Sequence, residues 1–407
     1  MSIYSNLKNR EAVTVYYIGN FLDTFAIALT FGIYAIFLQK NGLNLLQVNL
    51  INFTFMISIF ILEVPTGAFA DAIGRKNSVL LGTLFLIAGL ALYPIYRTFV
   101  GFIIAEILLA ISSAFGSGAW DAWMVDTSKK QGYVGKVDYV FSQSNVISKI
   151  ALIFGGFLGA YLAYVELGLP FYFGAFIGLI VLIFLLIFME SDQGKIEYSL
   201  KKNLIKMKNI AKDSISYSIS HKVIFWLLLG GIVSTLIFQP MNMYWNIRFN
   251  NMTGGDKIWL MGWLWAFISI AMTIGAYSVR HFLKKGKDYS YLMILVSLGI
   301  FVPVIFSSLS HTIFLAFPAF LIYQLFRGVE KPVAQSFLNK YAEPEKRATI
   351  LSFESMMSCL GAAGGLVLFG WIAKNHSIET SWIFAAIFSL FLIPIYLMAR
   401  RKERHYA

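Results

Sequence analysis

The chain has 407 residues, of which 58% are hydrophobic and only 13% are charged. An ordinary soluble domain carries roughly a quarter charged residues, so this composition excludes a typical soluble protein. The net charge of +12 does not indicate a nucleic-acid partner, because the Lys and Arg residues lie in short loops between apolar segments.

Twelve apolar segments follow one another along the chain, and each is long enough to cross roughly 30 Å of hydrocarbon. The first six are Ala12–Leu38, Leu45–Ala70, Ser78–Ile95, Val100–Val125, Val137–Tyr164 and Leu169–Met189. The second six are Val223–Ile247, Ile258–Phe282, Tyr289–Phe306, Ile313–Leu338, Ala348–Ile372 and Thr380–Ala399. We therefore expect an all-α membrane protein with twelve transmembrane helices.

The two sets of six segments resemble each other when the sequence is compared with itself. At an offset of about 208 to 210 residues, Gly67 aligns with Gly275 and Gly118 aligns with Gly328. Each match is weak alone, but all fall at one offset in the same helix order, as a duplicated six-helix half predicts.

The expected organisation has two pseudo-symmetric six-helix bundles and a connecting segment. Residues 1–190 form the N-terminal half and residues 223–407 the C-terminal half. Residues 191–222 are polar and rich in lysine, which predicts a cytoplasmic linker with an amphipathic helix on the membrane surface.

The basic residues predict the orientation of the chain. An even number of crossings puts both termini and the linker on one side, and that side carries most of the 33 Lys and Arg residues. By the positive-inside rule this side is cytoplasmic. We expect a multi-pass protein of the plasma membrane with both termini in the cytoplasm.

One motif follows the second span. Residues 67–76 read GAFADAIGRK, and we place them in a loop. The stretch resembles the signature of the major facilitator superfamily, whose second-to-third loop carries Gly, Asp and then Gly-Arg-Lys at this spacing. The resemblance covers the whole chain, extends to uncharacterised bacterial members and, less completely, to drug/proton antiporters, and implies transport by alternating access.

The same resemblance implies a gate at the cytoplasmic ends of the helices. In family members with this motif the Asp and the Arg bind across the two halves, and a carboxylate that ends the fourth helix joins them. A basic loop that only sets topology is the alternative interpretation. The expected gate residues are Gly67, Asp71, Gly74, Arg75 and Asp126.

Two stretches depart from the patterns of drug-exporting members. Many exporters carry an Arg in the fourth helix, and Glu106 occupies that place here, followed by Ala110 and Ser112. Residues 155–159 in the fifth span read GGFLG and lack the proline of the proton-antiporter motif. Both departures weaken an assignment to the drug antiporters.

Ionisable groups inside the spans are candidates for proton coupling. A charge at the bilayer centre is costly, so such a group normally faces a cavity, a partner or a pathway. Asp23 lies near the middle of the first span and is the first candidate; Glu106 in the fourth span is the second. A structural hydrogen bond for Asp23 remains open, as does an ion pair with Lys149 for Glu106. The tenth span also carries charges, at Arg327, Glu330 and Lys331.

The seventh span holds a dense polar and aromatic cluster. Pro240 can interrupt this span, and interrupted helices often mark transporter binding sites. Helix packing through polar contacts is the competing interpretation. The expected substrate-cavity residues are Asn20, Gln239, Asn242, Trp245, Asn246 and Arg327.

The leading hypothesis is a secondary transporter that exports amphiphilic or drug-like compounds in exchange for protons. Uptake of a sugar or a peptide remains an alternative, and a non-transporting receptor is an alternative from another class. The five histidines do not cluster and no ATP-binding glycine loop occurs, so we expect no enzyme, no metal and no cofactor. The expected partners are a small-molecule substrate, protons and the lipid bilayer, with no nucleic acid, and we expect a monomer.

Overall fold

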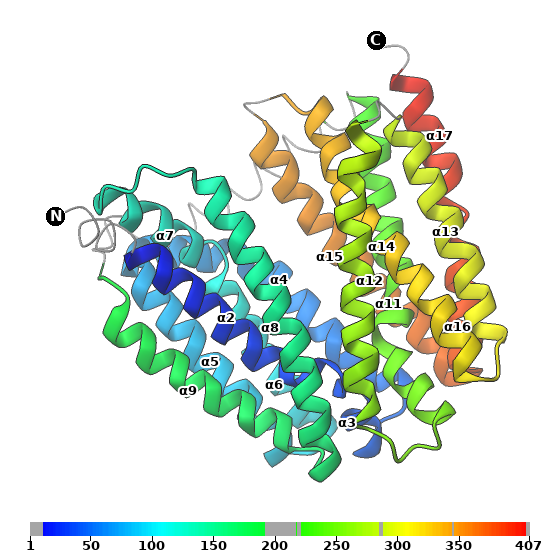
Figure 1. The fold of residues 1–407 in the computed structure, drawn as a ribbon, viewed down its shortest axis with the longest axis horizontal. Helices are drawn as coiled ribbons and strands as arrows, with labels where there is room; N and C mark the ends of the chain where they lie inside the picture. The colour runs from blue at the N-terminus through cyan, green and yellow to red at the C-terminus, as the bar shows by residue number, and fades with distance from the viewer. Residues whose placement is uncertain (1–10, 192–216, 218–220, 285–287, 344–345, 404–407) are drawn as a thin grey trace. The chain divides into compact units, whose positions relative to one another are not determined.

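The computed structural model describes residues 11–191, 217, 221–284, 288–343 and 346–403. These residues form α-helices and no β-strand (Figure 1). In the first part of the chain the helices are α2 (Glu11–Phe31), α3 (Tyr34–Lys40), α4 (Leu45–Ile73), α5 (Arg75–Ile95), α6 (Phe99–Gly116), α7 (Ala119–Lys130), α8 (Val137–Val165) and α9 (Leu169–Phe188). They are followed by α11 (Lys222–Met252), α12 (Leu260–Lys284), α13 (Tyr289–Leu309), α14 (Ile313–Tyr341), α15 (Arg347–Asn375), α16 (Ile378–Ser389) and α17 (Leu392–Glu403).

The helical architecture confirms the expected fold class. Within the described residues, 12 helical segments are long and apolar enough to cross a membrane. The expected amphipathic helix of the linker lies almost entirely outside the described residues.

Three expected spans are each divided into two helices. The first is α2 followed by α3, the fourth is α6 followed by α7, and the last is α16 followed by α17. Between α6 and α7, Gly118 has a φ of 71°, a left-handed conformation that glycine adopts without steric cost. Mean hydropathy is averaged over the residues on both sides of such a break. The apolar pattern of the sequence therefore does not reveal it.

The motif after the second span lies mostly in a helix, which corrects the expected loop. Helix α4 continues to Ile73, and α5 begins at Arg75. The whole connection is Gly74, whose φ of 91° requires the absence of a side chain. Two helices thus meet at a single residue, and Arg75 is held at the start of α5.

The chain divides into two compact units. Unit 1 comprises Met1–Phe37, Ser58–Ile205 and Ile258–Ala266, and unit 2 comprises Leu38–Ile57, Lys206–Lys257 and Phe267–Ala407. The halves 1–190 and 223–407 expected from the sequence stay a prediction.

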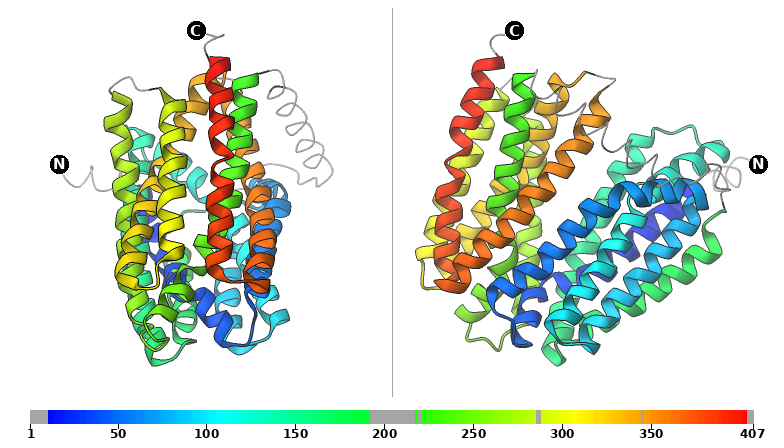
Figure 2. Two further views of the ribbon diagram at one scale, coloured as in Figure 1. Left: turned by 90° about the vertical axis from the view of Figure 1, so that its right-hand side faces the viewer. Right: turned by 180° about the vertical axis from the view of Figure 1, so that it is seen from behind.

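The same helix pairs form within each unit. In unit 1, α2 packs along α8 and α9, and α5 packs along α6 and α9. In unit 2, α11 packs along α15 and α17, and α13 packs along α14 and α16; Figure 2 shows α17 beside α11. These pairs correspond by position in the two sets of six spans, as a duplication predicts.

Glycines allow close approach at equivalent crossings. A Cβ added to Gly159 of α8 would lie 1.7 Å from the carbonyl oxygen of Leu29 on α2. A Cβ added to Gly365 of α15 would lie 2.2 Å from the carbonyl oxygen of Leu236 on α11. Membrane helices associate through such close packing, so these glycines fix the pairs on which each unit is built.

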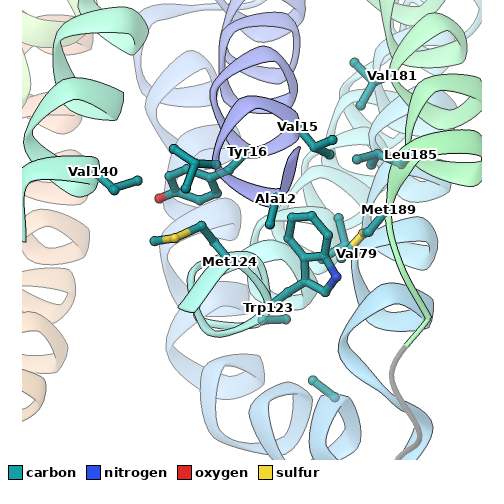
Figure 3. Close-up of a cluster of buried hydrophobic side chains, with 13 residues drawn as sticks. Ala12, Val15, Tyr16, Val79, Trp123, Met124, Val140, Val181, Leu185 and Met189 are labelled. Atoms are coloured by element: carbon teal, nitrogen blue, oxygen red, sulfur yellow. The ribbon is translucent and has the colours of Figure 1, made fainter. Parts of the chain in front are cut away.

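A cluster of buried apolar side chains lies in unit 1 close to the start of α5, where Arg75 and Lys76 end the motif. Trp123 and Met124 of α7 are 1% and 0% exposed, and they pack among side chains of α2, α5, α8 and α9 (Figure 3). Val79, one turn after Arg75, belongs to the same cluster. The cluster therefore holds the start of α5 against α7.

Candidate functional site

Two of the expected gate residues form an ion pair in unit 1. An Nη atom of Arg75 donates to a carboxylate oxygen of Asp126 and, at 2.7 Å, to the carbonyl oxygen of Ala122. Gly67 and Asp71 lie in α4, in a part of the helix whose side-chain contacts the structure does not describe. The structure thus brings together Arg75 and Asp126, and their role as a gate stays a proposal.

The lysine of the motif caps a helix, which sequence reasoning missed. Nζ of Lys76 donates to the carbonyl oxygens of Met189 and Leu186, at 2.5 and 3.1 Å. A cation at a helix C-terminus satisfies carbonyl groups that have no intrahelical donor and complements the helix dipole. Lys76 therefore fixes the end of α9 to the start of α5.

A polar ladder joins α2 and α8 in the middle of unit 1. Asn20 donates to the hydroxyl of Ser144 at 2.6 Å, and Thr24 donates to the hydroxyl of Ser148 at 3.5 Å. Both helices use positions four residues apart, so the contacts lie on one face of each. Asp23 is adjacent to this ladder on α2 and is partly buried.

Asp23 is not part of the ladder. Within the described residues, neither a hydrogen bond nor an ion pair engages its carboxylate. A carboxylate at mid-span without a fixed partner is costly as an anion, and protonation removes that cost.

Glu106, by contrast, has fixed partners. Its carboxylate accepts a hydrogen bond from the hydroxyl of Tyr34 on α3 and another, at 2.6 Å, from Tyr93 on α5. The side chain is 4% exposed, and rings of Phe102 and Phe171 stack near Tyr93. This group ties three helical segments together, and only the fold brings the two tyrosines to it.

Helix α11 is continuous through Pro240, which corrects the expected interruption. Proline has no N–H to donate to the carbonyl of Leu236, four residues earlier. That same carbonyl is the atom against which Gly365 of α15 packs. The indole of Trp382 also donates to the carbonyl of Pro240 at 3.0 Å. Contacts from α15 and α16 thus pack around the proline within unit 2.

The expected cavity residues of unit 2 divide into two groups. Arg327 of α14 donates to the Oδ1 atom of Asn242 on α11, and its guanidinium lies 5.1 Å from the ring centroid of Phe238. The structure therefore brings Arg327 and Asn242 together. Three others are buried in the packed interior of the unit, with 7%, 3% and 2% exposure: Gln239, Trp245 and Asn246.

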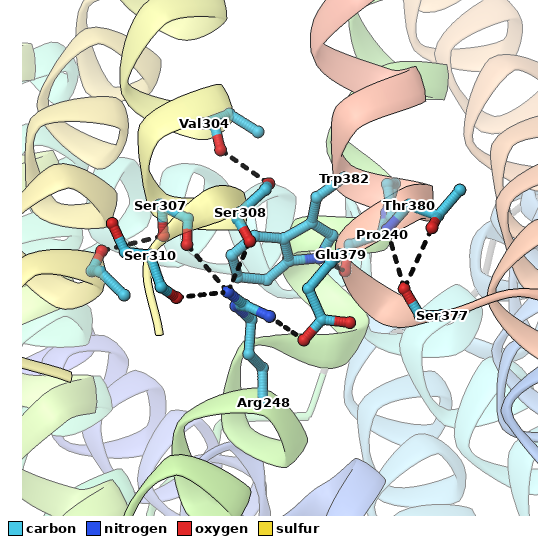
Figure 4. Close-up of polar contacts among 11 residues, drawn as sticks. Pro240, Arg248, Val304, Ser307, Ser308, Ser310, Ser377, Glu379, Thr380 and Trp382 are labelled. Atoms are coloured by element: carbon cyan, nitrogen blue, oxygen red, sulfur yellow. Dashed lines mark hydrogen bonds and ion pairs between the residues drawn. The ribbon is translucent and has the colours of Figure 1, made fainter. Parts of the chain in front are cut away.

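Arg248, near the end of the same helix, is part of a structural network (Figure 4). It forms an ion pair with Glu379 of α16, and its Nη2 atom donates to the carbonyl oxygens of Ser307 and Ser308 at 2.9 and 3.0 Å. The guanidinium also lies 5.4 Å from the ring of Trp382. Arg248 thus caps the C-terminal end of α13 and joins it to α11 and α16.

Two acidic groups inside unit 2 each accept a hydrogen bond from a serine. The hydroxyl of Ser234 donates to Glu330 at 2.7 Å, and the hydroxyl of Ser358 donates to Glu354 at 3.0 Å. Sequence reasoning identifies Glu330 only as an intramembrane charge and misses Glu354. The signal for Glu354 is an acid at the start of a long apolar run.

Sequence comparison decides the family. Two overlapping stretches, 16–353 and 289–407, match the family model described as Major Facilitator Superfamily. The chain belongs to the major facilitator superfamily. The resemblance of residues 67–76 is thereby confirmed, and this major facilitator protein is a membrane transporter and not an enzyme.

Relatives of this transporter include two bacterial proteins. It is 24% identical over 391 residues to the uncharacterized MFS-type transporter YxaM of Bacillus subtilis (strain 168), covering 95% of this chain and 94% of YxaM. It is also 24% identical over 355 residues to the class H tetracycline resistance protein of Pasteurella multocida, covering 82% of each. Among solved structures, the nucleoside transporter NupG matches with a TM-score of 0.78 and 14% identity, over 95% of this chain and 98% of NupG. At that identity the likeness shows the fold alone.

Proposed function

We propose that this transporter moves a small organic solute by alternating access, in exchange for protons, and that it exports amphiphilic or drug-like compounds. The observation that carries the proposal is the Asp23 carboxylate, which lies at mid-span with no hydrogen bond or ion pair among the described residues. The similarity to a tetracycline resistance protein supports export. We also propose a monomer in the plasma membrane with both termini in the cytoplasm.

Asp23 is a better proton carrier than Glu106. A carrier must exist in two protonation states of similar free energy. The carboxylate of Glu106 holds three helical segments together through the hydroxyls of Tyr34 and Tyr93, so a change in its hydrogen bonding disturbs their packing, whereas no described hydrogen bond or ion pair engages Asp23. We therefore assign coupling to Asp23 and a structural role to Glu106.

The gate in this proposal is the Arg75–Asp126 pair. Both side chains are partly exposed, at 24% and 53%, so the pair can exchange its partners for water at modest cost. Such a pair suits a contact that forms and breaks in each transport cycle.

A second candidate function is proton-coupled uptake of a nutrient such as a sugar or a peptide. The contact between Arg327 and Asn242 favours it, because a guanidinium and an amide provide several directional hydrogen-bonding groups for a polar solute. Exporters of amphiphilic compounds need fewer such groups.

The test uses the purified protein in liposomes with an imposed pH gradient. Ethidium is a suitable first probe because its charge is permanent, so it does not distribute passively with pH as weak bases do. Exchange predicts that ethidium accumulates in liposomes with an acidic lumen. Co-transport of a nutrient predicts accumulation with an alkaline lumen, for which radiolabelled sugars and peptides are the probes.

The Asp23→Asn variant should reduce accumulation to the level of protein-free liposomes, because the amide cannot take up the proton. Glu166→Gln is the matched control, since Glu166 lies in a loop, is exposed and pairs with Arg97 at the surface. Proton coupling through Asp23 is wrong if the gradient drives no solute, or if Asp23→Asn transports like the wild type.

A further inference from the structure

Glu330 lies in α14, inside the membrane-spanning part of unit 2, and the mechanism above does not use it. Its side chain is partly buried, and it accepts a hydrogen bond from the hydroxyl of Ser234 on α11. A serine hydroxyl can donate to a carboxylate and to the carbonyl oxygen of a carboxylic acid alike. The contact with Ser234 therefore persists in both protonation states of Glu330.

Titratable groups from three helices interact electrostatically with Glu330. They are Arg327, Lys331 and Tyr323 of α14, Glu354 of α15 and Tyr396 of α17. Lys331 is exposed, whereas Arg327 is partly buried. Arg327 is therefore the cation of this group that lies inside unit 2.

Arg327 and Glu354 act on the charge of Glu330 in opposite directions. Arg327 is held by Asn242 and by the ring of Phe238, so it is positioned to balance one negative charge. A second ionised carboxylate nearby adds repulsion in a poorly hydrated region, and taking up one proton relieves it. Glu354 accepts a hydrogen bond from the hydroxyl of Ser358, one turn later on α15.

The hydroxyl of Tyr323 belongs to the same group. Tyr323 is 0% exposed, and its hydroxyl contacts the guanidinium of Arg327 and interacts electrostatically with Glu330. Arg327 is thus held by Tyr323 as well as by Asn242 and Phe238, which keeps its positive charge near Glu330.

We infer that Glu330 is a second proton-binding carboxylate, and that Glu354 and Arg327 set its protonation. Uptake forms an O–H bond on Glu330 from a proton of the aqueous phase, and release returns that proton to water on the other side. When Glu330 is neutral, the guanidinium of Arg327 loses an opposing charge and is available to an anionic or acceptor group of the solute. The inference rests on the proposed proton coupling and extends it to unit 2.

The test compares Glu330→Gln with wild type in proteoliposomes, using ethidium as the probe. We expect the variant to lose accumulation driven by the pH gradient but to retain exchange of labelled for unlabelled ethidium at equal pH, because exchange needs no net proton movement. Glu343→Gln is the control, since Glu343 is exposed and pairs locally with Lys346. Thermal unfolding of each variant in detergent verifies that it is folded.

A second measurement requires no solute. Difference infrared spectroscopy of the reconstituted protein during a pH titration should show one carboxyl band that is absent in Glu330→Gln, shifted in Glu354→Gln and unchanged in Glu343→Gln. The inference is overturned if Glu330→Gln keeps every titrating carboxyl band, or if it keeps gradient-driven accumulation that Asp23→Asn loses. Failure of the proposed function is distinct, because the wild type itself then accumulates no ethidium under the gradient.

Discussion

Arg248 and Arg327 show how the same side chain serves two purposes within unit 2. Arg248 is 3% exposed and has a carboxylate, backbone carbonyls and an aromatic ring around it. Arg327 is partly buried, and an amide oxygen and a phenyl ring hold it. A guanidinium with many fixed acceptors is a structural group, whereas one held by a neutral amide can change partners.

The structural role of Arg248 predicts a loss of stability on substitution. Arg248→Met should lower the free energy of unfolding by about 2 to 4 kcal/mol, because it leaves carbonyls at the end of α13 and the carboxylate of Glu379 without their donor. Unfolding of the purified protein by heat or by SDS measures the change.

The matched control for Arg248 is Arg97→Met. Arg97 pairs with Glu166 at 3.0 Å, but both side chains are about half exposed, at 43% and 53%. Exposed pairs contribute about 0 to 1 kcal/mol, so this variant should be nearly as stable as the wild type. Equal effects of the two substitutions would contradict the structural role of Arg248.

At the scale of helices, each unit depends on glycine contacts between long helices. The crossings of α8 on α2 and of α15 on α11 put a glycine against a backbone carbonyl. Because neither side of such a contact can move away without shifting a whole helix, a single methyl group is enough to disturb it.

Gly365→Ala should therefore destabilise unit 2 by about 1 to 3 kcal/mol, since its Cβ would lie 2.2 Å from the carbonyl oxygen of Leu236. Gly364→Ala is the control in the same helix, because its Cβ would meet no atom closer than 3.9 Å. That variant should be unchanged or slightly more stable, as alanine favours a helix. Thermal unfolding in detergent distinguishes the two, and similar stabilities would refute the packing account.

The sequence predicted the spans well, because a run of apolar residues is a local property. It did not predict the break at Gly118, since hydropathy is insensitive to a single left-handed residue. Nor did it show that α4 continues through the motif to Ile73, because glycine and polar residues there are equally typical of a loop.

The candidate site was predicted less completely than the spans. Intramembrane charges such as Asp23 and Arg327 stand out from apolar surroundings, so the sequence alone identifies them. Their partners do not stand out. Tyr93 for Glu106 and Ser234 for Glu330 are ordinary residues of apolar helices, and only tertiary packing makes them partners.

At the scale of the whole molecule, the two units share helix pairing and differ in chemistry. Unit 1 has the Arg75–Asp126 pair and an acid without a described partner, Asp23, whereas unit 2 has an acid, Glu330, that interacts with both Arg327 and Glu354. A duplicated scaffold with different polar groups suits a transporter that separates gating from solute contact. The proposed exchange of solute for protons requires that the two movements be linked.

The most direct test of the account is to record proton flux and ethidium flux in the same proteoliposomes, with a pH-sensitive dye in the lumen and no initial pH gradient. An outward gradient of ethidium should drive protons inward in the wild type, reversing when the ethidium gradient is reversed, and Asp23→Asn should abolish the proton signal. The account is contradicted if ethidium leaves the wild-type liposomes without proton movement and at the same rate as from liposomes with Asp23→Asn.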